Sequence, residues 1–178
     1  WAAAENVLGP LIALEHFNGA KSWSLVITAE SVGLIVGSII ALKIKPRYPL
    51  RFLQLSSFTL TFYIFTMAKP QSLFVIAFAA FLFGITLDLW GTFWNTAMQK
   101  KVPREALSRV ASFDAMGSMM FRPIGLAIAA PLSALFGIEN FLYILAGVTV
   151  VAITLSFLNK EVRNMSFEDL GNDQKSLR

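Results

Sequence analysis

Four polar side chains recur on one face of a long apolar stretch of this sequence. They are Asp88, Thr92, Asn95 and Gln99. Their spacings of four, three and four residues bring them to the same side of an α-helix. Polar groups inside a bilayer are expensive and need a partner or water. This face could therefore be the wall of a water-filled pathway, or it could hydrogen-bond to neighbouring helices.

Two tryptophans, Trp90 and Trp94, lie one helical turn apart beside this polar face. Under the pathway interpretation they edge the wall. The candidate pathway residues on this helix are then Asp88, Trp90, Thr92, Trp94 and Asn95. Under the alternative interpretation, Trp94 and Gln99 lie near the end of the helix and anchor it at the membrane interface, where tryptophan is enriched. The sequence leaves both interpretations open.

A second polar line comprises Asp114, Ser118 and Arg122, which follow one another at intervals of four residues on the next apolar stretch. Asp114 lies in the first turns of its helix, where the helix dipole stabilises an anion, so we predict a structural role for it. Arg122 lies about 12 Å further along the helix axis, too far for a direct ion pair with Asp114. As a further candidate pathway residue, it needs a carboxylate, a carbonyl or an anionic substrate. Its candidate protein partners are Glu30, Asp88 or a residue elsewhere in the protein.

Glu30 and Asp88 are candidates for proton coupling. Each is the only charged residue of its apolar stretch, and removal from water favours the neutral, protonated form of a carboxyl group. Glu30 could equally be a charge of the outer vestibule that water reaches. The single histidine, His16, is expected to lie exposed at the outer surface rather than in a proton relay.

The elements that position these residues are helices in a membrane. The 178-residue chain is 56% hydrophobic with a mean hydropathy of +0.62, and 15% of its residues are charged, against roughly 25% in a soluble domain. We predict an all-α transmembrane fold with one partial span, too short to cross, and five complete spans. They cover Ala2–Leu14 (partial), Ser24–Leu42, Phe52–Ala68, Ser72–Gln99, Val110–Phe136 and Phe141–Leu158.

Lysine and arginine gather in alternate connections between these spans. Four lie in the turn Lys43–Arg51, four in the turn Lys100–Arg109 and four in the tail 159–178, whereas the intervening turns hold only Lys21 and Lys69. Because basic loops stay on the cytoplasmic side, we predict a multi-pass cell-membrane protein whose C-terminus is cytoplasmic. A soluble helical bundle has no reason for this segregation. The net charge of +4 thus indicates topology rather than a nucleic-acid partner.

Small residues and prolines mark where these helices pack or bend. The spacing of Gly33 and Gly37 predicts a close approach of two helix backbones, and prolines inside a span predict kinks. Structural or gating roles are assigned to Gly33, Gly37, Arg47, Arg104, Arg109, Asp114, Pro123 and Pro131. The chain has no cysteine, and it shows neither a nucleophile elbow, a phosphate-binding loop nor paired metal ligands. We therefore predict no enzyme activity, no cofactor and no metal.

Two groups of short motifs together extend over nearly the whole chain. The first comprises Trp94–Gln99, Val102–Pro103, Leu107–Val110, Asp114, Gly117–Ser118, Pro123-x-Gly125 and Pro131. The second comprises Gly9–Pro10, Asn18–Ala20, Ser22–Trp23, Gly33-x-x-x-Gly37 and Lys43, Lys45, Pro46, Arg47 and Pro49. They resemble, respectively, helices 10 and 11 and helices 7 and 8 with the 8–9 loop of major facilitator superfamily transporters. The resemblance is closest to the bacterial macrolide-efflux and siderophore-exporter-like branch.

The resemblance implies the C-terminal six-helix half of a twelve-helix carrier. Residues 1–158 would form a truncated helix 7 and helices 8–12, and residues 159–178 the cytoplasmic tail. Because the chain starts at Trp1 within an apolar stretch, without a basic leader, we expect a fragment cut inside a helix. In this family helices 7 and 10 line the cavity with contributions from 8 and 11, which would put Asp88, Trp90, Trp94 and Asn95 near the pathway. Helices 9 and 12, the uncharged stretches here, would face lipid.

The chain departs from the family pattern in two places. The Lys43–Arg51 turn lacks the acidic residue of the superfamily's loop signature, so a complete charge-relay gate is not implied. Ala130 stands before Pro131 where the family has glycine, so close packing at that kink is not implied either.

Three functions follow as hypotheses. The first is proton-coupled efflux of small hydrophobic compounds by alternating access, which needs the missing N-terminal half, membrane lipids, a small-molecule substrate and protons as partners. The second is an uptake symporter for a small solute or an anion held by Arg122. The third is a membrane protein that transports nothing and serves in sensing or assembly.

Overall fold

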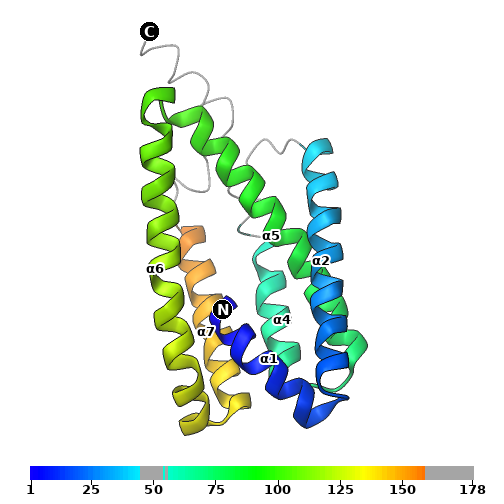
Figure 1. Ribbon diagram of the computed structural model, residues 1–178. Helices are drawn as coiled ribbons and strands as arrows, with labels where there is room; N and C mark the ends of the chain where they lie inside the picture. Colours follow the sequence, from blue (N-terminus) through cyan, green and yellow to red (C-terminus); the bar gives the residue numbers. More distant parts are fainter. Residues whose placement is uncertain (45–53, 55, 159–178) are drawn as a thin grey trace.

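The computed structural model describes residues 1–44, 54 and 56–158. This part of the chain is all-helical and contains no strand, which confirms the predicted helical class. Figure 1 shows the six helices as an elongated bundle. They are α1 (Ala2–His16), α2 (Ala20–Lys43), α4 (Phe58–Ala68), α5 (Leu73–Lys101), α6 (Arg104–Phe136) and α7 (Ile138–Leu158).

Four of the helices, α2, α5, α6 and α7, are long and apolar enough to cross a membrane. The protein is therefore membrane-embedded. The sequence predicted five complete spans, and the difference lies in α4, whose 11 residues fall short of a span. The expected start of that span, Phe52, lies outside the described residues. The first helix, α1, has 15 residues and is short, as predicted for a partial span.

The helices extend further into the predicted turns than expected. The basic turn Lys100–Arg109 shrinks to Val102 and Pro103, so Arg104 and Arg109 are helical. Pro103 explains this, because a proline just before the first helical turn has the right backbone angle and no amide to leave unsatisfied. Arg47, the other predicted gating residue of the basic turns, lies outside the described residues.

The turn predicted at Gly137–Asn140 is reduced to a single residue between α6 and α7. Gly137 has a φ of +80°, a conformation that a residue without a Cβ adopts at little cost. Within the described residues, three prolines lie inside helices without ending them, although proline lacks the amide donor of a regular helix. Pro10 lies inside α1, and Pro123 and Pro131 lie inside α6, which continues through both.

The largest interface of the bundle joins α2 to α5, and glycines lie at its centre. A Cβ atom on Gly33 would overlap the carbonyl oxygen of Phe81, and one on Gly84 would overlap the carbonyl oxygen of Glu30. At Gly37 the corresponding atom would come within 2.6 Å of the carbonyl oxygen of Ile85. The two backbones therefore touch directly, which is the function of small residues at four-residue spacing in membrane helices.

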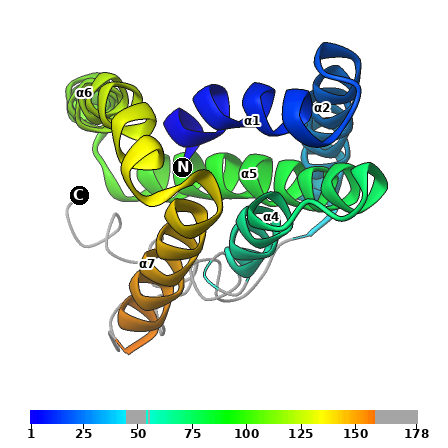
Figure 2. The same ribbon diagram turned by 90° about the horizontal axis from the view of Figure 1, so that it is seen from below.

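The three largest interfaces pair α2 with α5, α4 with α7 and α1 with α6. These pairs are related by an approximate symmetry that exchanges α1 with α5, α2 with α6 and α4 with α7. The exchange turns the α2–α5 pair into the α1–α6 pair and leaves the α4–α7 pair unchanged. The chain runs down α1 and up α5 in Figure 1, so the exchanged helices point in opposite directions. Seen from below, α1 lies on one side of α5, and α4 and α7 lie on the other (Figure 2). The smaller interfaces break the symmetry, since α4 also packs on α5.

Candidate functional site

The predicted polar face of α5 divides into separate environments. Asp88 is half-buried against α2, where its Cβ lies 3.0 Å from the position that a Cβ on Gly37 would occupy. Its Oδ2 atom is buried and makes no hydrogen bond. Thr92 and Asn95 are exposed, and the Asn95 amide donates to the carbonyl oxygen of Gly91 in its own helix at 2.8 Å. Only Asp88 of this face is thus held in a helix interface.

One of the two tryptophans of α5 hydrogen-bonds to α6. The rings of Trp90 and Trp94 are stacked with their centroids 5.5 Å apart. The indole nitrogen of Trp94 donates a hydrogen bond of 3.1 Å to the Oδ2 atom of Asp114. The sequence predicted a structural role for Asp114 at the start of its helix, and the structure gives its carboxylate an indole as hydrogen-bond donor. All three side chains are exposed.

Arg122 lies on α6, which is at one side of the bundle in Figure 1. Every residue from 108 to 124 is exposed. In the described part of the chain Arg122 forms no ion pair, so neither Glu30 nor Asp88 is its partner. Apolar side chains share this surface. They include Phe113, Met116, Met119, Met120, Phe121 and Ile124.

The best-defined polar site joins three other helices and was not predicted as a unit. Glu5 of α1 is 7% exposed, and Tyr63 of α4 is completely buried. The Tyr63 hydroxyl donates a hydrogen bond of 2.8 Å to the Oε1 atom of Glu5. The carboxyl group of Glu30, which is on α2 and half-buried, faces the Glu5 carboxyl. We call Glu5, Glu30 and Tyr63 the carboxyl cluster.

Packing around the carboxyl cluster fixes its geometry. The Tyr63 ring meets the Trp1 ring edge-on at 5.3 Å and lies 5.6 Å from the Phe83 ring, measured between centroids. Phe83 is on α5, next to the glycine at the α2–α5 contact. That contact presses Gly84 onto the backbone of Glu30, so the position of the Glu30 carboxyl depends on a glycine of another helix.

The carboxyl cluster can hold a proton. Glu5 and Glu30 face each other, and Tyr63 faces both. Among the described residues, no charged side chain of α5, α6 or α7 forms an ion pair with either carboxyl group. Two carboxylates that face each other repel, and a proton on one of them would remove this repulsion. Release and recapture of this proton would change the net charge of the site by one.

Glu30 was singled out from the sequence, but Glu5, which lies in the predicted partial span Ala2–Leu14, was not. A carboxyl group in an apolar helix is energetically costly at Glu5 as it is at Asp88. The presence of a carboxyl group in an apolar stretch could therefore have made Glu5 a candidate for proton coupling. Tyr63 gave no such signal, since tyrosine is common in membrane helices. The described residues contain no group of three or more His, Asp or Glu side chains that could hold a metal ion.

Replacing Tyr63 by phenylalanine should lower the stability of the bundle by about 1–2 kcal/mol, because a buried carboxyl oxygen loses its donor while the ring remains. The measurement is thermal unfolding in detergent. Tyr143→Phe is the matched control, because Tyr143 is only half-buried and should change stability by less than about 0.5 kcal/mol. Equal effects of the two substitutions would show that the Tyr63–Glu5 bond contributes nothing.

No protein-family model matches this chain, and neither does any curated protein or solved structure. Function must therefore be inferred from the site and the arrangement of the helices.

Proposed function

We propose that this chain is the C-terminal half of a proton-coupled secondary transporter of the major facilitator type, which exports small hydrophobic compounds by alternating access. The observation that carries the proposal is the carboxyl cluster, in which the buried Glu5 and Tyr63 are joined by a hydrogen bond and the half-buried Glu30 comes from a third helix. Intramembrane carboxyl groups of this kind form proton relays in pumps and transporters.

The pairing of the helices supports transport over a purely structural role. The helices form two three-helix units of opposite orientation, α1, α2 and α4 in one and α5, α6 and α7 in the other. Many secondary transporters are built from two such inverted units. In such proteins one bundle rocks against another around a central site. Glu5, Glu30 and Tyr63 lie on α1, α2 and α4, which form one of the two units. The backbone contact that positions Glu30 comes from α5, which belongs to the other unit. Motion between the two units would therefore alter the carboxyl cluster.

The exposed surface of α5 and α6 supports the need for a second bundle. It carries Trp90, Asn95 and Arg122 together with a continuous apolar area. In the proposed carrier the N-terminal six-helix half faces this surface, and the substrate passes between the halves. The basic ends of α2 and α5 lie on the cytoplasmic side of the cell membrane in this arrangement.

Transport under an imposed pH gradient tests the proposal. A fluorescent hydrophobic cation and a neutral analogue are loaded into liposomes that contain either this chain alone or the longer protein that includes it. We expect gradient-driven efflux from the longer protein and none from the chain alone, because alternating access needs both halves. Efflux by the chain alone would contradict its role as a half, and no flux by the longer protein would contradict transport.

One observation favours a second candidate, uptake of a small anionic solute. Arg122 is a cation with no ion pair in the described part of the chain, on the surface assigned to the pathway. An anionic substrate would supply the missing partner. Accumulation of an anion in the same liposomes, in place of efflux, would favour this candidate.

A further inference from the structure

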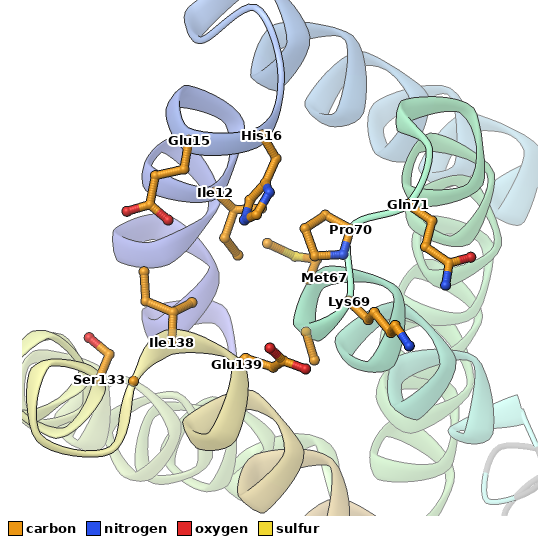
Figure 3. Close-up of a pocket in the computed structure, with 12 residues that line it drawn as sticks. Ile12, Glu15, His16, Met67, Lys69, Pro70, Gln71, Ser133, Ile138 and Glu139 are labelled. Carbon is orange, nitrogen blue, oxygen red and sulfur yellow. The ribbon is translucent and has the colours of Figure 1, made fainter.

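A cavity of about 600 Å³ opens at the end of the bundle that lies away from the α5–α6 turn. Its walls come from the C-terminal end of α1, the turn between α4 and α5, and the turn between α6 and α7 (Figure 3). Three connections that are far apart in the sequence thus share one opening. The volume falls within the range of about 300–1,000 Å³ that small-molecule sites in proteins occupy.

The bottom of the cavity is apolar and rigid. Ile12 of α1 is 3% exposed and Met67 of α4 is 1% exposed, so both belong to the packed core while they line the cavity. Ile138, at the start of α7, adds a half-buried aliphatic side chain. A ligand with a hydrophobic body would remove the exposed part of Ile138 from water and rest on the packed Ile12 and Met67.

The rim of the cavity is acidic on balance. Glu15 and Glu139 line it, and Figure 3 shows the Glu139 carboxylate turned inward and the His16 ring over the opening. Lys69 also lines the cavity, but its ammonium group points outward in Figure 3. No ion pair neutralises Glu15 or Glu139 within the described residues. The rim therefore offers carboxylates that a bound cation would compensate.

We propose that this cavity binds a small organic cation, with its hydrophobic body against Ile12 and Met67 and its positive charge beside Glu139 and Glu15. An anion is disfavoured because it would face two carboxylates, and a bare metal ion is disfavoured because the described residues bring no three His, Asp or Glu side chains together to hold it. The site is separate from the carboxyl cluster. Its occupancy requires neither a proton gradient nor a second bundle, so it does not depend on the proposed transport.

Equilibrium binding of radiolabelled tetraphenylphosphonium to the chain in phosphatidylglycerol nanodiscs tests the proposal. We expect saturable binding that Glu139→Gln weakens about threefold to tenfold, because one carboxylate at the rim of the cavity is lost. Lys69→Gln should have the opposite effect and strengthen binding, since it removes a competing cation. Both side chains are exposed, so neither substitution is expected to disturb folding. Unchanged affinity in both variants, or stronger binding in Glu139→Gln, would overturn the proposal.

A lipid amine presents the same chemistry as a small cation, and a second lipid composition distinguishes the two. Nanodiscs that contain phosphatidylethanolamine supply ammonium headgroups at high concentration. An unchanged tetraphenylphosphonium affinity in these nanodiscs would support a site for small molecules. Complete loss of binding would overturn the proposal in favour of a lipid headgroup site.

Discussion

Replacing Gly84 by leucine should prevent α2 and α5 from packing and cost the bundle about 3 kcal/mol or more. A side chain at this position would have to occupy the space of the Glu30 carbonyl oxygen, which belongs to a helix backbone and cannot rotate away. Gly33 receives the backbone of α5 in the same way from the opposite side. Because this is the largest interface of the bundle, its loss should separate α2 from the other helices.

Gly91 provides the matched control on the same helix. A Cβ added there would meet no atom within 4 Å, so Gly91→Leu should leave stability unchanged or raise it slightly through better helix propensity. Thermal unfolding and size-exclusion chromatography in detergent compare the two variants. Gly84→Leu is expected to aggregate or melt well below the unsubstituted chain. Similar melting temperatures for both variants would show that α2 and α5 do not touch at Gly84.

Helix content and the glycine contact were accessible from sequence because both depend on local pattern. Runs of apolar residues long enough to span a bilayer have few alternatives to helix, and Gly33 and Gly37 lie one turn apart whatever else surrounds them. Helix ends were less accessible. The basic turn was predicted over Lys100–Arg109, yet only Val102 and Pro103 lie between α5 and α6. In α1 the helix continues through Pro10, and the Trp23 ring packs on the neighbouring Gly9.

The site was partly accessible for the same physical reason. A carboxyl group in an apolar stretch is costly wherever it lies, so Glu30 and Asp88 could be chosen without a structure. The pairing of Glu30 with Glu5 and Tyr63 could not, because it depends on how α1, α2 and α4 meet. Conversely, the spacing that placed Asp88 and Asn95 on one face said nothing about α2, which covers Asp88 and leaves Asn95 exposed.

Substituting either carboxyl group of the carboxyl cluster should uncouple transport from protons. In the longer protein we expect Glu5→Gln and Glu30→Gln each to reduce pH-gradient-driven efflux to the level of liposomes without protein. Glutamine has the shape of glutamic acid and its amide oxygen can still accept the hydrogen bond from Tyr63, but it cannot bind and release a proton. Folding should therefore persist while coupling is lost. Wild-type efflux should rise as the outside becomes more acidic at constant internal pH, and efflux by either variant should not respond.

Two further variants decide whether this loss belongs to the carboxyl cluster. Glu15→Gln removes a carboxylate from the same helix as Glu5 but at an exposed position, and should leave the pH response intact. Asp88→Asn addresses the other candidate for coupling, whose Oδ2 atom is buried without a hydrogen bond. If Asp88→Asn alone abolished the response while Glu5→Gln and Glu30→Gln retained it, the proton would be carried on α5 and the carboxyl cluster would be structural. Glu5→Gln, Glu30→Gln and Asp88→Asn each remove one ionisable group and little volume. The comparison therefore separates the effect of lost proton binding from the effect of changed packing.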